Sequence, residues 1–256
     1  IEGTFTLLEA AKKAWSDGES WKPERKFLQV STDEVYGSLG DTGYFSETTP
    51  LNPRSPYSAS KASADMLVKA YFDTYKMPVN ITRCSNNYGP YQFPEKFIPL
   101  LINNSLKKAD LPVYGDGKNI RDWIYVEDHV RAIDMVIDKG KAGEVYNIGG
   151  NNEKTNIDVV KTIISTLKSL LPDDDVRRNY ISENLIKYVK DRKGHDRRYA
   201  IDAMKIKNEL GWETKISFAE GIVKTVKWYL DNSSWLSEVT SGAYEEYYKK
   251  FYKGVV

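Results

Sequence analysis

Hydrophobic and polar residues follow two different periods in the first third of the chain, and the change from one period to the other predicts alternating helices and strands. Residues 4–14 (TFTLLEAAKKA) place Phe5 and Leu8 on one side at helical spacing. A short apolar run, residues 26–31 (KFLQVS), follows a polar loop and is typical of a buried strand.

The next two segments continue this alternation. Residues 56–75 predict a helix that begins at Pro56 and ends before Pro78, and residues 79–83 (VNITR) again predict a strand. Strand, helix and strand in this order indicate a parallel α/β unit. Ligands of such sheets bind beyond the carboxyl ends of the strands, where residues 32–34 and 85–87 fall.

The periodicity is looser after residue 90. It predicts a helix over residues 97–108, short strands at residues 124–126 and 145–148, and a helix over residues 202–210 that ends at Gly211. Ser217 and Glu220 have the spacing of a capping box at the start of a helix over residues 218–230. We therefore expect an α/β fold in which a parallel sheet is followed by a smaller, mixed α/β lobe.

Composition excludes several classes of partner. The 256 residues include 37 Lys and Arg against 36 Asp and Glu, so we expect no nucleic-acid-binding face and no polybasic membrane anchor. The single cysteine cannot form an internal disulfide, and with two histidines a zinc cluster would need mainly carboxylate ligands. No apolar run is long enough to span a membrane. We expect a cytoplasmic protein without a structural metal and without a membrane partner.

Tyr57 and Lys61 lie four residues apart on a predicted helix and therefore share one of its faces. A phenol is a poor base at neutral pH, but an adjacent ammonium stabilises the phenolate and lowers the pKa of the hydroxyl. Such a pair can remove a hydroxyl proton while hydride leaves the same carbon. For an isolated pair, the alternative is a packed aromatic ring beside a solvated lysine.

The tetrad Ser31-Thr32-Asp33-Glu34 directly follows the predicted strand, which places a hydroxyl and two carboxylates at the edge of a sheet. Two neighbouring carboxylates in one pocket tend to separate their pKa values, so that one acts as an acid and the other as a base. Elimination of water requires this division. The alternative is a polar turn whose carboxylates are solvated or cap the next segment.

Gly37, Gly40 and Gly43 spell GxxGxxG, which is close to a dinucleotide-binding fingerprint. That fingerprint must follow a first strand and open a helix, whereas residues 44–53 (YFSETTPLNP) predict a loop. We therefore assign no phosphate binding to these glycines, and we expect the phosphate-binding turn of a dinucleotide site to lie upstream of Ile1.

With strand, tetrad and helix in this order, the chain resembles the extended short-chain dehydrogenase/reductases and, within them, the dTDP-glucose 4,6-dehydratases of bacteria. The likeness covers nearly the whole chain. It includes the segments STDEVYG at Ser31, PYSASKASAD at Pro56, RCSNNYGPYQFPEKFIP at Arg83, PVYGDGKNIRDWIYVEDH at Pro112, YNIGGNNEKTN at Tyr146 and GHDRRYAID at Gly194. Related epimerases and decarboxylases resemble the chain in the Tyr/Lys pair but usually lack the Asp-Glu pair.

The resemblance implies NAD-dependent dehydration of dTDP-glucose to dTDP-4-keto-6-deoxyglucose, in deoxysugar and dTDP-rhamnose biosynthesis. Tyr57, supported by Lys61, would deprotonate the C4 hydroxyl as NAD takes the hydride, and Thr32 would hydrogen-bond to the same oxygen. Glu34 would then remove the C5 proton while Asp33 protonates the departing C6 hydroxyl, before hydride returns to C6.

The resemblance also implies which residues bind the ligands. Tyr57, Lys61 and Asn87 would contact NAD. The nucleotide-sugar substrate would be bound by Thr32, Asn86, Lys96, Phe97, Pro112, Val113, Tyr114, Arg121, Asn156, Asp191, Arg192 and His195. Lys193 stands where the family usually has proline, so we expect a less rigid loop after Asp191.

The domain organisation implied by the resemblance is Rossmann-like. Residues 1–90 would form the C-terminal half of an NAD-binding domain with a doubly wound parallel sheet, whose first strands lie outside this chain. Segments around residues 120–150 would return to it, residues 91–256 would mainly form the substrate lobe, and the protein would be a homodimer. Two alternatives stay open: another nucleotide-sugar epimerase or decarboxylase, and a chain that binds sugar nucleotide without turning it over.

Overall fold

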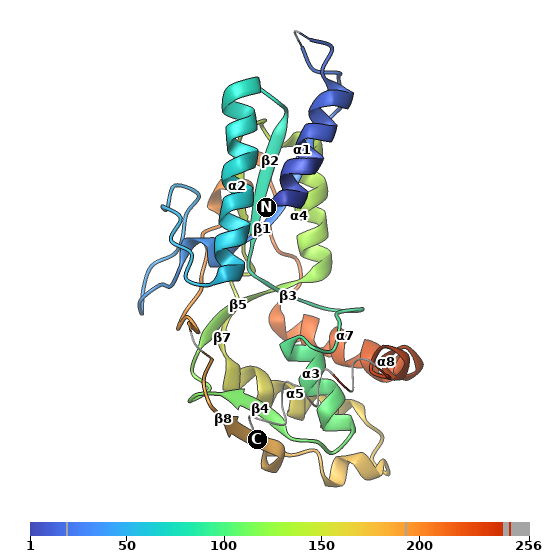
Figure 1. Ribbon diagram of the computed structural model, residues 1–256. Helices are drawn as coiled ribbons and strands as arrows, with labels where there is room; N and C mark the ends of the chain where they lie inside the picture. Colours follow the sequence, from blue (N-terminus) through green and yellow to red (C-terminus); the bar gives the residue numbers. More distant parts are fainter. Residues whose placement is uncertain (19, 193, 243–245, 247–256) are drawn as a thin grey trace. The chain divides into compact units, whose positions relative to one another are not determined.

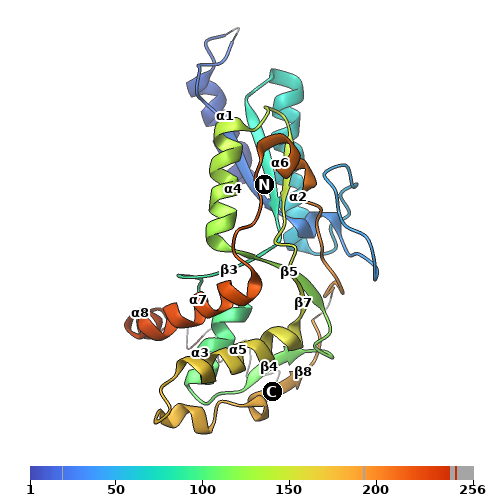
Figure 2. The same cartoon turned by 180° about the vertical axis from the view of Figure 1, so that it is seen from behind.

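The computed structural model describes residues 1–18, 20–192, 194–242 and 246, and Figures 1 and 2 show it from two opposite sides. Two compact units form from alternating stretches of the chain. Unit 1 contains residues 1–87, 122–151 and 196–215, and unit 2 contains residues 88–121, 152–195 and the described residues from 216 onward. Lys193 lies outside the described residues.

Unit 1 is built on a parallel sheet with the strand order β1-β2-β6. These strands are β1 (Phe27–Thr32), β2 (Val79–Cys84) and β6 (Val145–Ile148). Thr32 pairs with Cys84 in the register of β1 and β2, so both strands end at the same level. This parallel pairing, with a helix between β1 and β2, confirms the predicted α/β class.

Helices cover both faces of this sheet. They are α1 (Glu2–Trp15), α2 (Pro56–Tyr75), α4 (Val126–Lys139) and α6 (Met204–Leu210). Val79 and Ile81 of β2 belong to one hydrophobic cluster with residues of α1 and α2, whereas Ile148 of β6 belongs to a second cluster with residues of α4 and α6. Because successive side chains of a strand point to opposite faces, Arg83 lies on the same face as Val79 and Ile81.

Local sequence signals explain where the main helices begin. Ser55 and Ser58 form a capping box at the start of α2, with Pro56 in its first turn, and Ser217 and Glu220 form another at the start of α7 (Phe218–Asp231). Both helices were predicted, as was the left-handed C-terminal cap at Gly211. The capping box of α7 was predicted, whereas the start of α2 was predicted from Pro56 and its Ser55/Ser58 box is a finding of the structure.

Several predicted boundaries differ from the structure by one to four residues. The helix predicted to reach residue 108 ends two residues earlier, and the helix predicted from residue 202 begins at Met204. The strand predicted at residues 124–126 is part of β5 (Ile120–Tyr125), and Val126 opens α4 instead. Glu127 and Asp128 explain this last difference, because acidic residues stabilise the first turn of a helix.

Unit 2 is mainly helical. In both views α3 (Phe97–Leu106) and α7 lie beside α5 (Asn156–Leu170), and contacts between residues of these helices support this arrangement. The remaining elements are β3 (Asn86–Tyr88), β4 (Leu111–Tyr114), β7 (Glu153–Thr155), η2 (Val176–Asn179), η3 (Glu183–Leu185), β8 (Ile186–Val189) and α8 (Ser233–Val239). Strand β4 pairs with β8 in parallel, and a further sheet has the order β3-β5-β7. In the described part of the chain, no helix combines the length and apolar character needed to cross a membrane.

Candidate active site

The tetrad lies where strand β1 turns into a short 3-10 helix, η1 (Asp33–Tyr36). The Thr32 hydroxyl accepts a hydrogen bond from the backbone N–H of Glu34 at 3.3 Å and donates one to Asp33 Oδ1 at 3.3 Å. Asp33 is buried and Glu34 is partly exposed. The hydroxyl therefore caps η1, and neither carboxylate of the tetrad is used for that purpose.

Tyr57 lies in the first turn of α2 with 55% of its surface exposed. Partial burial raises the pKa of Tyr57, and the negative charges of Glu34 and Asp33 act in the same direction. This is opposite to the effect we expected from Lys61, whose Nζ instead donates to the backbone oxygen of Val30 at 2.7 Å. The fold thus brings the phenol near both carboxylates of the tetrad.

Asn87 follows the carboxyl end of β2 and has a fixed side-chain amide. Its Nδ2 donates to the backbone oxygen of Ser85 at 3.1 Å, and its Oδ1 lies 2.8 Å from His129 Nδ1. Burial lowers the pKa of His129 to about 4, so at neutral pH a neutral imidazole donates its Nδ1 proton to Asn87. Sequence reasoning missed this contact because His129 lies 42 positions further along the chain.

A buried serine hydroxyl lies just beyond the end of β2. Ser85 is buried, and within the described residues its Oγ has no hydrogen-bond partner. Buried polar atoms normally have a partner, so this hydroxyl and the fixed amide of Asn87 fit a polar ligand bound at the strand end. Asn86, predicted as a substrate ligand, is partly exposed beside them. Cys84 is a free thiol whose pKa burial raises to about 12, so it offers no thiolate there.

In unit 2, the pairing of β4 with β8 brings Tyr114 to the segment that contains Asp191, Arg192 and His195. Tyr114 pairs with Val189, and the Arg192 guanidinium lies 4.9 Å from the centroid of the Tyr114 ring. His195 Nδ1 donates to Asp191 Oδ1 at 2.6 Å. Sequence order alone gives no indication of this pairing, because the two strands are far apart in the chain.

Gly115 makes this approach possible. Its φ is +58°, and a Cβ atom at this position would lie 2.9 Å from Asp191 Oδ2. Both the left-handed backbone and the close carboxylate therefore require glycine at the end of β4.

Positive charge gathers beside these residues. Arg121 is buried, and its Nη1 donates to the backbone oxygen of Ile120 at 2.7 Å. Burial lowers the pKa of His195, and the charges of Arg192 and Arg121 lower it further. Two guanidinium groups near one neutral histidine suit the oxygens of a diphosphate.

The other predicted substrate ligands are less closely joined to this group. Asn156 is buried at the first position of α5, and its backbone N–H donates to the backbone oxygen of Asn119 at 3.0 Å. Lys96 is exposed and pairs with Glu95 at 3.0 Å, just before Phe97 begins α3. In β4, Pro112 and Val113 are both buried, and Val113 has no exposed surface.

The glycine pattern at Gly37, Gly40 and Gly43 lies in a loop and opens no helix, as predicted. Gly37 has a φ of +90°, and a Cβ atom there would lie 2.6 Å from the backbone oxygen of Asn52. The turn therefore explains this glycine without any phosphate.

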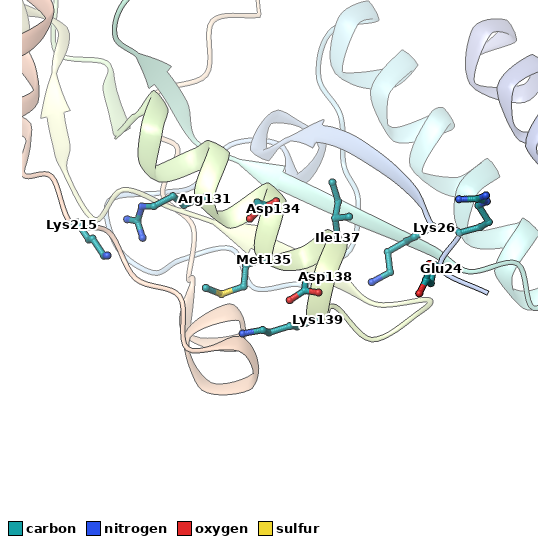
Figure 3. Close-up of a pocket in the computed structure, with 10 residues that line it drawn as sticks. Glu24, Lys26, Arg131, Asp134, Met135, Ile137, Asp138, Lys139 and Lys215 are labelled. Carbon is teal, nitrogen blue, oxygen red and sulfur yellow. The ribbon is translucent and has the colours of Figure 1, made fainter. Parts of the chain in front are cut away.

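A surface hollow of about 970 Å³ in unit 1 contains none of the predicted site residues. Figure 3 shows its lining, in which α4 contributes side chains of both charges and Lys26 comes from the segment before β1. Lys26 Nζ donates to the backbone oxygens of Val136 and Gly140. We assign this hollow no function, and the described residues contain no group of three or more metal-ligating side chains.

Comparisons with known proteins show the family to which the chain belongs. The family described as GDP-mannose 4,6 dehydratase matches residues 1–225. A dTDP-glucose 4,6-dehydratase of Xanthomonas campestris is 54% identical over 245 residues, which cover 95% of this chain and 69% of that protein.

Solved structures with the same fold include two further proteins with that activity in their names. The Bacillus anthracis dTDP-glucose 4,6-dehydratase in complex with NAD is 55% identical, with a TM-score of 0.82 over 93% of this chain and 70% of that one. The Streptomyces venezuelae dTDP-glucose 4,6-dehydratase, with NAD and TYD bound, is 44% identical, with a TM-score of 0.83 over 93% and 68%. The Rossmann-like fold is confirmed by these neighbours.

Proposed function

Because this chain belongs to the dTDP-glucose 4,6-dehydratase family, we propose that it catalyses the NAD-dependent conversion of dTDP-glucose to dTDP-4-keto-6-deoxyglucose. One observation in unit 1 carries the proposal. Tyr57 lies near both Asp33 and Glu34, so a redox base and an acid–base pair meet at the carboxyl edge of one parallel sheet.

Bound NAD supplies the hydride acceptor for C4 and the hydride donor for C6. Tyr57, Lys61 and Asn87 would hold it. The buried, unpartnered hydroxyl of Ser85 and the amide of Asn87, which His129 orients, support this assignment because both are polar groups fixed at a strand end.

Tyr57 removes the proton of the C4 hydroxyl, and the Thr32 hydroxyl hydrogen-bonds to the same oxygen. The phenolate form of Tyr57 requires a neighbouring cation, and Lys61, one helical turn away, would supply it on release of its Nζ from the backbone oxygen of Val30. The new C4 carbonyl makes the C5 hydrogen acidic, so that water can be eliminated in the next step.

Glu34 removes the C5 proton and Asp33 protonates the departing C6 hydroxyl. The cap on the Glu34 backbone supports the placement of the base, and the proton that Thr32 donates to Asp33 would turn to the C4 oxygen when substrate binds. A redox pair without this acid–base pair gives no dehydration, which favours a dehydratase over an epimerase or decarboxylase.

Arg121 and Arg192 would bind the diphosphate, with Tyr114 and His195 beside it. The remaining sugar-nucleotide contacts would come from Asn86, Lys96, Phe97, Pro112, Val113, Asn156 and Asp191. Supporting this assignment, Arg192 lies over the Tyr114 ring, and the charges of Arg192 and Arg121 both act on His195.

The enzyme would act in the cytoplasm as a homodimer that forms through α2. Met66 on α2 is 65% exposed, so this helix presents an apolar side chain to solvent, which supports an interface there. Light scattering of the purified protein after size exclusion measures this state, and a monomer at all concentrations would contradict it.

The test of the proposed function is conversion of dTDP-glucose by the folded, purified protein in the presence of NAD. We expect a 4-keto sugar nucleotide that absorbs in alkali, together with incorporation of one solvent hydrogen at C5. Release of an epimerised or decarboxylated sugar, or binding without turnover by an NAD-loaded sample, would reject the dehydratase assignment.

A further inference from the structure

Arg83 lies one position before the end of β2 and is 5% exposed. Its guanidinium is held from two sides: Nε donates to Asp65 Oδ2 at 2.9 Å, and Nη1 donates to Tyr36 Oη at 2.9 Å. The guanidinium carbon also lies 4.9 Å from the centroid of the Tyr36 ring. A planar fork with two donor directions can make both contacts at once, which an ammonium cannot reproduce.

One of these partners belongs to the helix that carries the redox pair. Asp65 is buried on α2, four residues after Lys61 and eight after Tyr57. Residues at this spacing lie on one face of a helix, so an anchor at Asp65 fixes both the rotation of α2 and its position along the sheet. Lys61 adds a second attachment through Val30.

The other partner belongs to the short helix that carries the acid–base pair. Tyr36 is the last residue of η1, three positions after Asp33, and positions three apart lie above one another in a 3-10 helix. The Tyr36 hydroxyl donates to Asn147 Oδ1 at 2.8 Å, and the Asn147 backbone N–H donates to Glu47 Oε1 at 2.8 Å. Tyr36 is therefore fixed between Arg83 and β6.

The sheet register places Arg83 between β1, which leads into the tetrad, and β6, which carries Asn147. Arg83 pairs with Ser31, the first residue of the tetrad, on one side and with Asn147 on the other. The guanidinium thus lies at the point where β1, β2, β6, α2 and η1 meet. A charge buried this deeply persists only when its hydrogen bonds are satisfied, so the arrangement has little freedom to vary.

We propose that Arg83 is a positioning residue that holds the Tyr57/Lys61 pair and the Asp33/Glu34 pair in their working placement, through Asp65 on α2 and Tyr36 on η1. This inference rests on the proposed function. Each contact of the Arg83 side chain should therefore affect a different step of the reaction. Loss of the Asp65 contact should mainly slow the oxidation at C4, and loss of the Tyr36 contact should mainly slow the elimination of water.

The experiment compares Arg83→Lys, Asp65→Asn and Tyr36→Phe with the wild-type enzyme. For Arg83→Lys we expect kcat to fall by about 10²-fold, because displacement of catalytic groups by about 1 Å has effects of that order, while KM for dTDP-glucose changes less than about twofold. The isotope effect with substrate deuterated at C4 reports oxidation, and solvent exchange at C5 reports elimination. We expect Asp65→Asn to slow the first step more and Tyr36→Phe to slow the second step more.

Asn80→Ala is the matched control for a purely structural role. Asn80 is buried in the same strand, at its opposite end, and its Nδ2 donates to the backbone oxygens of Lys141 and Glu144. Its loss should destabilise the fold without lowering kcat of the folded enzyme. If Arg83→Lys does not fold, the two milder variants decide the question through their step selectivity.

Two outcomes would overturn the inference. The first is a kcat for the Arg83, Asp65 and Tyr36 variants that is no lower than that of Asn80→Ala at equal folded fraction. The second is equal slowing of both steps by Asp65→Asn and Tyr36→Phe. An inactive wild-type enzyme would instead reject the proposed function itself, so the two failures are distinguishable.

Discussion

Individual side chains of the tetrad have separate tasks because Thr32 already provides the cap of η1. That hydroxyl satisfies the backbone N–H of Glu34, so the cap of η1 does not depend on the Glu34 carboxylate. A single change at this carboxylate therefore tests chemistry with little effect on local structure.

For Glu34→Gln we expect binding of the sugar nucleotide to be retained, while exchange of the C5 hydrogen with solvent falls by about 10²- to 10⁴-fold, the usual contribution of a general base. The measurement is deuterium incorporation at C5 during incubation in heavy water. Glu153→Gln, on β7, is the matched control and should exchange normally. Undiminished exchange in Glu34→Gln would remove Glu34 from the role of base.

His129 predicts a pH dependence of stability. Its pKa falls from 6.5 to about 4 on folding, because burial disfavours the charged form. The unfolded chain therefore binds a proton at His129 more readily than the folded chain does. The contribution of neutral His129 to the free energy of unfolding is present above pH 6.5 and is lost as the pH falls toward 4. The total loss is on the order of 3 kcal/mol. Urea unfolding at several pH values measures it. His129→Gln should flatten this slope, and an unchanged slope would contradict the assignment.

At the level of whole elements, a capping box holds the first turn of α2, which carries Tyr57. Its capping box joins Ser55 and Ser58 through reciprocal hydrogen bonds of 3.0 Å, one residue on either side of the dipeptide Pro56-Tyr57. The last turn of α2, by contrast, ends at Lys76 in a left-handed conformation, far from the tetrad in sequence.

Ser55→Ala should destabilise the protein by about 1 kcal/mol, the usual cost of a lost N-cap, and should also lower kcat because the turn that carries Tyr57 frays. Ser217→Ala removes the equivalent cap of α7, which carries no site residue, and so should cost similar stability without loss of kcat. Urea unfolding and steady-state kinetics of both variants decide this, and equal effects on kcat would argue against a special role of the α2 cap.

The elements around the tetrad could be predicted from sequence because their signals are local. Residues within one or two turns determine three of these predictions: the bounds of α2, the strand before the tetrad and the capping box of α7. The contacts of Arg83 could not be predicted in this way, because Asp65, Tyr36 and Asn147 are distant in sequence. A partial signal existed: Tyr57, Lys61 and Asp65 repeat every four residues on α2, which marks a polar stripe on a helix face that packs against a sheet.

Across the whole molecule, the proposed catalytic residues belong to unit 1 and the proposed diphosphate ligands belong to unit 2. Chemistry and substrate affinity should therefore respond to different substitutions. Sequence reasoning gave no signal that residues 196–215 belong to unit 1, because the strand pairing and helix contacts that define this unit are not visible in local periodicity.

For Arg121→Lys we expect KM for dTDP-glucose to rise by about 10- to 100-fold, because a guanidinium hydrogen bond to a charged oxygen is lost, with kcat within a few-fold of wild type. Calorimetric titration with dTDP should show the same loss of affinity. Arg177→Lys, which affects a partly exposed pair with Asp175 in unit 2, is the control and should leave both values unchanged. A fall in kcat with constant KM would place Arg121 with the chemical residues instead.

The way the chain alternates between its units limits how substrate preference can change. The chain passes from one unit to the other after residues 87, 121, 151, 195 and 215, so neither unit is a continuous stretch of sequence. A single recombination event cannot therefore transplant a complete ligand-binding half from one relative to another. New specificity in this architecture has to arise by point substitution or by exchange of short loops, and engineers who wish to graft a different nucleotide site must replace three segments together.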